Sequence, residues 1–206
     1  AMIATGAYYE GAFCGTARMD GRYYGIPSGM YHLAMLYNKD MFDAAGVPYP
    51  SADWDAPVTL DYIAQVAPKL TSGEGANKVY GFNYFGMNPY TWMMITRTKN
   101  PERYAYDADG NIRINTPEHK EVLAWYWDLI SGGYVPSPTE TAILSTADMF
   151  FSGKLAMTVE GTWNMTRVPT AEFNVGYATL PSGGEGMTTH FLDSFVIYST
   201  TRHPEE

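Results

Sequence analysis

The sequence has very little cysteine and few basic residues, and each deficit excludes a class of function. Its single cysteine, Cys14, leaves no disulfide within the chain and no cysteine-based zinc motif. Lys and Arg number 13 against 22 Asp and Glu, which gives a formal net charge of −9. Because nucleic-acid phosphates and anionic lipid surfaces attract basic residues, this balance argues against both as partners.

Long hydrophobic runs are also missing. No stretch of about 18 apolar residues occurs, so the sequence predicts no transmembrane helix. Residues 1–6 have neither the basic nor the apolar region of a signal peptide. Residues 201–206 place Pro204 and two acids where a helix is about to begin. We therefore expect a chain that carries no signal peptide and is truncated at its C-terminus.

Motifs for catalysis, cofactors and metals are absent as well. The sequence has no GxSxG elbow, no P-loop, no GxGxxG after a strand and no HExxH zinc motif. Its four histidines share no ligand spacing, and the loop from Asp107 departs from the calcium-loop pattern because glycine comes at the fourth position. We expect no catalytic residue, metal or cofactor. Glu160 and Asp193 remain open as the carboxylate pair of a glycoside-active enzyme.

Aromatic residues, in contrast, are abundant. They form 15% of the chain, with 17 Tyr, 9 Phe and 5 Trp. Tyr and Trp offer a flat apolar face and a polar tip, which suits both a hydrophobic core and a site for a flat ligand. Composition alone leaves these two interpretations open.

Segments typical of strands and helices alternate along the chain. Thr59 and Thr116 are each followed by an amphipathic stretch, as expected of residues that cap a helix. Asp20-Gly21 and Asp109-Gly110 are turn signals between strand-like runs. The alternation predicts an α/β fold with a mostly parallel sheet. The expected strands include residues 33–37, 79–83, 155–159 and 195–198, and the expected helices 60–70, 116–131 and 146–151.

Three stretches, in this order, carry a family resemblance. They are residues 24–50, with Tyr-Gly-Ile-Pro and Asn-Lys-Asp-Met-Phe; residues 109–136, with a hairpin and a helix; and residues 149–163, which end in Gly-Thr-Trp. Together they resemble the family 1 extracellular solute-binding proteins, the maltose-binding-protein-like receptors of ABC importers. The resemblance implies a periplasmic-binding-protein-like type II lobe and strands that cross a hinge.

The resemblance also implies an organisation and a function. Residues 1–27 match the remnant of lobe one and the first hinge strand, residues 28–189 lobe two, and residues 190–206 the return crossing and the truncated start of a lobe-one segment. The implied function is capture of a mono- or oligosaccharide and its delivery to ABC permease subunits, without catalysis. The implied protein is a monomer, either periplasmic or lipid-anchored on the outer face of the cytoplasmic membrane.

The resemblance and the chemistry of a sugar together predict the ligand-binding residues. A pyranose has an apolar C–H face, which an aromatic ring covers, and a rim of hydroxyls, which polar side chains must satisfy. The resemblance places Tyr31, Tyr90 and Trp163 at the cleft, with Trp92 nearby, and puts Asp193 where many members have glycine. The polar partners expected at the rim are Asp193, Glu160, Asn83 and His32.

Other functions remain open at this stage. A polyamine or another small solute is an alternative ligand for the same fold, since Glu160 and Asp193 are acids beside candidate aromatics. A stand-alone lobe that serves as an interaction module is a further alternative.

Overall fold

The computed structural model describes residues 18–84, 89–100, 107, 109 and 111–203; the side chains of residues 18, 19 and 89–91 lie outside this description. The chain forms two compact units. We call residues 1–32 with 190–206 the ribbon unit, and residues 33–189 the sheet unit. Strand β3 (Ile26–Asn38) contributes to both units.

The ribbon unit is built from short antiparallel strands. β1 (Arg18–Met19) pairs with β2 (Arg22–Tyr23) through a turn in which Asp20 and Gly21 have φ of 51° and 75°. Two positive φ angles are typical of the tight hairpin turn that Asp-Gly favours, so the predicted turn is confirmed. The first half of β3 pairs antiparallel with β7 (His190–Phe195).

The sheet unit has strand order β4-β5-β3-β6. Its strands besides β3 are β4 (Asn83–Tyr84), β5 (Met157–Gly161) and β6 (Val175–Ala178). β5 and β6 both run antiparallel to β3, and β4 runs parallel to β5. The α/β fold is therefore confirmed, but the expectation of a mostly parallel sheet is wrong. Alternation of strands and helices along the sequence does not reveal that β3 lies between β5 and β6, which both run antiparallel to it.

Side-chain caps explain where most of the helices begin. Thr59 and Thr116 accept hydrogen bonds from the backbone N–H three residues on, as the sequence predicts, and Asn38, Ser137 and Ser145 do the same. The helices are α1 (Lys39–Ala45), α2 (Leu60–Leu70), α3 (Pro89–Lys99), α4 (Pro117–Ser131), α5 (Pro138–Ile143) and α6 (Thr146–Phe151), with 3₁₀ helices η4 (Gly75–Asn77) and η6 (Thr162–Thr170).

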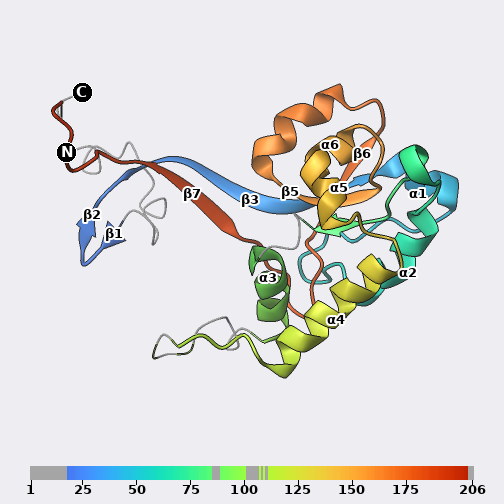
Figure 1. Ribbon diagram of the computed structural model, residues 1–206, viewed down its shortest axis with the longest axis horizontal. Coiled ribbons are helices and arrows are strands. Elements are labelled where there is room, and N and C mark those ends of the chain that lie inside the picture. Colours follow the sequence, from blue (N-terminus) through green and yellow to red (C-terminus); the bar gives the residue numbers. More distant parts are fainter. Residues whose placement is uncertain (1–17, 85–88, 101–106, 108, 110, 204–206) are drawn as a thin grey trace. The chain divides into compact units, whose positions relative to one another are not determined.

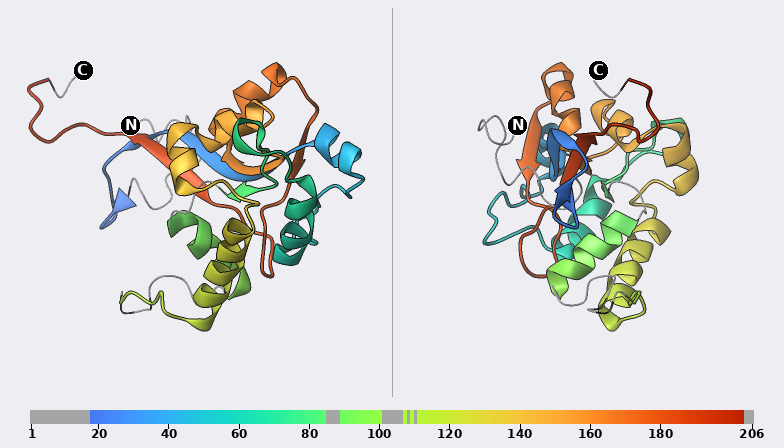
Figure 2. Two further views of the ribbon diagram at one scale, coloured as in Figure 1. Left: turned by 45° about the vertical axis from the view of Figure 1, so that its right-hand side comes forward. Right: turned by 90° about the vertical axis from the view of Figure 1, so that its left-hand side faces the viewer.

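The helices of the sheet unit lie on both sides of its sheet. Figures 1 and 2 show α6 and η6 on one side, and α2, α3 and α4 on the other. Under α6, a buried cluster joins Leu36 of β3 to Met149, Phe150 and Leu155. On the opposite side, a Cβ on Gly81 would lie 2.1 Å from the carbonyl oxygen of Ala67 in α2, so the backbone there must be glycine.

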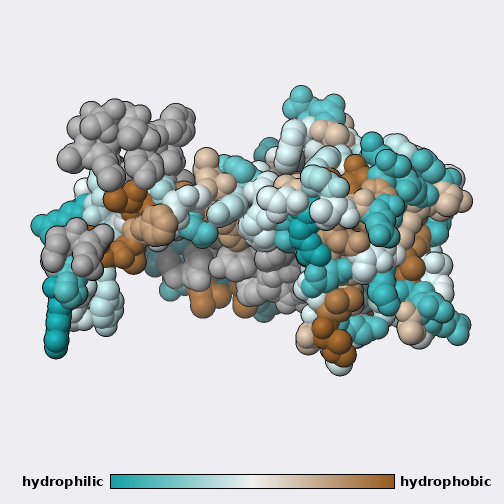
Figure 3. All heavy atoms as spheres, turned by 90° about the horizontal axis from the view of Figure 1, so that it is seen from above, coloured by the Kyte–Doolittle hydropathy of each residue, from teal (hydrophilic) through white to brown (hydrophobic). Residues whose placement is uncertain are grey.

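On the face drawn in Figure 3, hydrophobic side chains form separate patches among hydrophilic ones. Among the residues that the structure describes, no helix has the length and apolar character needed to cross a membrane.

Candidate functional site

The parallel strands β4 and β5 end at the same edge of the sheet. Tyr84 is the register partner of Val159, and β5 continues to Gly161, where η6 begins. Antiparallel β3 reaches this edge with Leu33, the partner of Gly161. Ligands of open α/β sheets bind outside the carboxyl ends of parallel strands. We call residues 160–164, with the ends of β4 and β5, the carboxyl edge.

Trp163 is an exposed aromatic residue at the carboxyl edge, and its ring lies over the backbone of Gly161. A Cβ on Gly161 would lie 2.2 Å from the indole atoms Cη2 and Cζ2, so only glycine leaves room for the ring. Gly161 has an ordinary extended conformation, with φ of −81°, so the requirement is for space and not for backbone freedom. Trp163 remains 37% exposed. The residue therefore combines a supported position with access to solvent.

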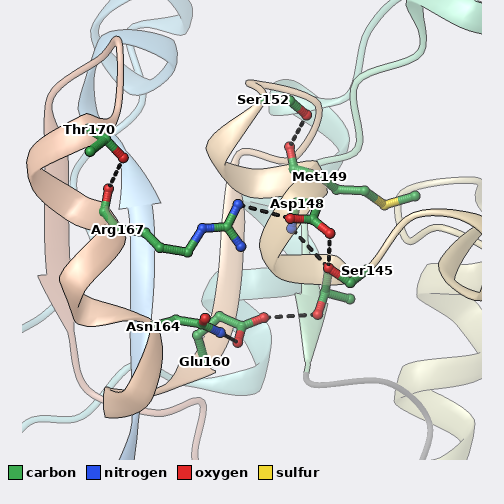
Figure 4. Close-up of polar contacts among 9 residues, drawn as sticks. Ser145, Asp148, Met149, Ser152, Glu160, Asn164, Arg167 and Thr170 are labelled. Carbon is green, nitrogen blue, oxygen red and sulfur yellow. Dashed lines mark hydrogen bonds and ion pairs between the residues drawn. The ribbon is translucent and has the colours of Figure 1, made fainter.

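Glu160 precedes this glycine and is buried, with 2% of its surface exposed. Its Oε1 accepts a hydrogen bond of 2.8 Å from Thr146 Oγ1, and its Oε2 accepts one of 2.8 Å from Asn164 Nδ2 (Figure 4). Burial raises the pKa of Glu160 above its ordinary value. Hydrogen bonds from Thr146, Asn164 and the Gly161 backbone, and the charge of Arg167, oppose that shift without cancelling it.

A second tie joins η6 to α6 in the same network. Arg167 Nη2 donates to Asp148 Oδ1 at 2.9 Å, and Ser145 Oγ donates to Asp148 Oδ2 at 2.6 Å (Figure 4). These two hydrogen bonds hold the pKa of Asp148 below its usual range. The Arg167 guanidinium also lies 4.5 Å from the ring centroid of Phe151. Helix α6 therefore contacts η6 directly through Arg167, and it is linked to Asn164 indirectly through Glu160.

Asn83 and Trp92, two further predicted residues of the sheet unit, are less exposed than Trp163. Asn83 is 1% exposed, and its Oδ1 accepts hydrogen bonds from the Tyr126 hydroxyl and the Tyr84 backbone. Trp92 is half-buried, and its ring packs edge-on against His119 at 5.4 Å between centroids. Tyr90 belongs to α3, but its side chain lies outside the described residues.

Three predicted residues belong to the ribbon unit. Tyr31 lies over Gly29, where a Cβ would come within 2.7 Å of its hydroxyl oxygen. Asp193 is exposed and is the register partner of Gly29. His32 is opposite His190, with ring centroids 4.5 Å apart. Since successive side chains of a strand point to opposite faces, Tyr31 and His32 are presented on different faces of the ribbon.

A groove of about 480 Å³ lies elsewhere on the sheet unit, beside the N-terminus of α2. Pro57, Leu60 and Gly183 contribute to its lining, together with the ion pair between Lys99 and Glu121. It is separate from the predicted ligand residues, since its lining includes none of them. In the described part of the chain, no three His, Cys, Asp or Glu side chains gather to hold a metal ion.

The sequence did not predict that Thr146, Asn164 and Arg167 lie around Glu160. The only local signal is position, because Asn164 directly follows Trp163 and Thr146 opens a capped helix. That Thr146 turns toward a carboxylate 14 residues later depends on how α6 packs against β5.

Fold and site together define an α/β unit with an aromatic site at the carboxyl edge of its sheet. The family profile described as bacterial extracellular solute-binding protein matches residues 5–206. The chain belongs to this family, which confirms the resemblance.

Individual relatives agree with this assignment. A binding protein of Brucella abortus is 28% identical over 207 residues, covering 94% of this chain and 47% of the relative. An arabinooligosaccharide-binding protein of Halalkalibacterium halodurans is 33% identical over 115 residues, covering 54% of this chain and 23% of its own. The chain thus spans about half the length of the Brucella relative.

Solved structures share the fold. A Listeria monocytogenes ABC substrate-binding protein in complex with cycloalternan superposes with a TM-score of 0.82 at 23% identity, over 98% of this chain and 52% of that one. The GacH receptor of Streptomyces glaucescens, solved unliganded and with acarbose, gives a TM-score of 0.74 at 20% identity, over 96% and 50%.

Proposed function

We propose that this chain is the sugar-contacting part of an extracytoplasmic receptor that delivers its solute to an ABC import permease. The observation that carries the proposal is the position of Trp163. Its indole lies on Gly161 at the carboxyl edge and stays 37% exposed. A ring held in this way is suited to cover the apolar C–H face of a pyranose.

The remaining contacts are part of the same proposal. Tyr90, Tyr31 and Trp92 are proposed as further aromatic contacts. Buried hydroxyls left without a partner cost about 1–3 kcal/mol each, so a sugar site also needs polar groups around its rim. Asp193 and His32 are proposed for this role. Asn83 is proposed to act through its Nδ2, because its Oδ1 already accepts two internal hydrogen bonds.

The relatives support a sugar as the solute and a receptor as the class. One is named for arabinooligosaccharides, and the related structures hold cycloalternan or acarbose. Because the chain spans about half of such proteins, we propose that residues 28–189 form one lobe of two, with 1–27 and 190–206 in the hinge crossings. Solute that contacts both lobes shifts the population toward a closed form, which the permease recognises.

The proposal includes what the protein does not do and where it works. Members of this family bind solute outside the cytoplasm, so we propose a periplasmic or lipid-anchored monomer that performs no catalysis. A polyamine ligand or a glycoside-active site needs carboxylates that face the solute. Both oxygens of Glu160 already accept internal hydrogen bonds, which favours a neutral sugar over either alternative.

Isothermal titration tests the proposal. The protein is titrated with mannotriose, acarbose, an arabinooligosaccharide and spermidine, and is separately incubated with aryl glycosides. We expect one of the sugars to bind, and Trp163→Ala to weaken that binding at least tenfold, about 1.4 kcal/mol.

The matched control is Trp127→Ala, because Trp127 is also exposed, at 63%, but lies on α4. It should bind like the wild type. Binding of spermidine alone, turnover of a glycoside, or equal losses in the two variants would each contradict the proposal.

A further inference from the structure

We propose that Glu160 is a positioning residue that fixes Trp163 for the solute and does not contact the solute itself. This inference rests on the proposed function, since it concerns the same site. It gives the buried carboxylate a different role from the hydroxyl-binding role expected from the sequence.

The Glu160 side chain is almost inaccessible from solvent. Only 2% of the Glu160 surface is exposed, although the residue stands at the end of a strand and beside an exposed tryptophan. Each carboxylate oxygen already accepts a side-chain hydrogen bond, one from Thr146 and one from Asn164. Because Glu160 is buried, a sugar hydroxyl reaches these oxygens only if the packing around them opens, and a donor displaced in the process loses its partner at a cost of about 1–3 kcal/mol.

The Glu160 carboxylate joins helix α6 to the segment that carries Trp163. Thr146 opens α6, and Asn164 follows Trp163 in η6, so Glu160 bridges a helix on one side and the segment that carries the indole on the other (Figure 4). The indole ring of Trp163 packs on the backbone of Gly161. The backbone on both sides of Trp163 is therefore held: by β5 before it, and by the Asn164 hydrogen bond after it.

The hydrogen bonds of Glu160 with Thr146 and Asn164 involve other residues than the ion pair between Arg167 and Asp148. That pair also joins η6 to α6, but it lies farther along η6, and its two side chains are 37% and 48% exposed. Partly exposed ion pairs contribute little, about 0–1 kcal/mol. The buried hydrogen bonds of Glu160 are thus the stronger constraint on the segment next to Trp163. Positioning of this kind improves affinity by reducing the ordering needed on binding.

A double-mutant cycle separates positioning from contact. Affinity for mannotriose, or for whichever sugar of the titration panel binds most tightly, is measured for Glu160→Ala, Trp163→Ala and the double variant. If Glu160 acts through Trp163, Glu160→Ala weakens binding about fivefold to tenfold alone and adds less than about twofold to Trp163→Ala. Additive losses would show a direct contact and overturn the inference. Absence of binding by the wild type would instead refute the proposed function.

A readout without ligand tests the positioning directly. The indole N–H resonance of Trp163 is assigned in a ¹H–¹⁵N NMR spectrum by its loss in Trp163→Phe. We expect Glu160→Ala to shift or broaden this resonance. Glu160→Gln should restore most of it, because Gln keeps the shape of the side chain and its amide oxygen can accept from Asn164 while its NH2 group donates to the Thr146 hydroxyl. An unchanged resonance in Glu160→Ala would overturn the inference, as would a failure of Glu160→Gln to restore it.

Controls exclude a general loss of structure. Glu140 is a carboxylate of the same unit that accepts hydrogen bonds from Ser137 and Tyr80 and shares no partner with Glu160. Glu140→Ala should leave the Trp163 resonance in place. If Glu160→Ala does not fold, Thr146→Val and Asn164→Ala each remove one donor and should move the resonance by themselves. No movement in either variant would contradict the inference.

Discussion

Trp163 in the sheet unit and Tyr31 in the ribbon unit are placed by the same local device. Each aromatic side chain lies over a glycine two residues earlier, Gly161 in one case and Gly29 in the other. Gly29 and Tyr31 share a face of strand β3, whereas Trp163 lies in η6, just after β5 ends at Gly161. In both units the missing Cβ of the glycine leaves the space that the ring occupies.

The two rings differ in what holds the segment around them. Asn164, the residue after Trp163, is bound by a buried carboxylate that is itself bound to α6. Tyr31 lies on a strand whose register partners at this point are residues of β7 alone. The comparison indicates that the glycine makes room for the ring, whereas the buried network makes its position specific to one orientation.

Removal of the buried carboxylate should have the largest effect. Glu160→Ala leaves the Thr146 and Asn164 donors without a partner and opens a small cavity, so we expect the free energy of unfolding to fall by about 2–4 kcal/mol. Glu160→Gln should cost less than half as much. Chemical denaturation followed by circular dichroism measures both. A loss below about 0.5 kcal/mol for Glu160→Ala would mean that the network does not hold the segment.

Filling the space under the indole should have the next largest effect. In Gly161→Ala the new Cβ would overlap the ring of Trp163, which must move outward, at an expected cost of about 1–3 kcal/mol. Sugar affinity should fall with it, and the tryptophan emission should shift to longer wavelength. An unchanged emission spectrum, together with unchanged affinity, would show that Trp163 is not part of the binding site.

A pH titration of stability isolates the charge of Glu160. Burial raises its pKa in the folded protein above the ordinary value of 4.5, so the stability tied to its protonated form is present below pH 4.5 and is lost as pH rises through the folded pKa. The difference in unfolding free energy between wild type and Glu160→Gln should therefore move against the wild type as pH rises from 4.5. The lowered pKa of Asp148 acts below 3.8 and is common to both proteins. A flat difference would contradict the assigned burial.

The equivalent change in the ribbon unit should have the smallest effect. Gly29→Ala also overlaps an aromatic ring, that of Tyr31, but residues 30–32 around this ring are exposed or half-buried, whereas Glu160 beside Gly161 is buried. We expect a loss in stability below about 1 kcal/mol, since this strand can adjust without disturbing a buried carboxylate. A loss as large as that of Gly161→Ala would erase the distinction between the two units.

Local features of the fold could be predicted from the sequence because they depend on neighbouring residues. The caps at Thr59 and Thr116 and the turn at Asp20 each need only a few residues. Strand direction could not be predicted in the same way. β3 pairs with β5 more than 100 residues later, and no local pattern states which way the partner runs.

The same difference between local and distant contacts applies to the site. The place of Trp163 after a strand could be predicted from its Gly-x-Trp motif, whereas its contact with a solute stays a prediction. The partners of Glu160 could not, because Thr146 and Asn164 become its donors only when α6 packs on β5. An acid beside a site therefore looks like a ligand group in the sequence, whereas the structure gives it internal partners.

The most direct test of this account is a crystal structure of the protein with the sugar selected by titration. The account predicts a pyranose ring stacked on the exposed part of the Trp163 indole, with both Glu160 oxygens still bound to Thr146 and Asn164. A sugar bound away from Trp163, or a Glu160 carboxylate turned onto a sugar hydroxyl, would contradict it.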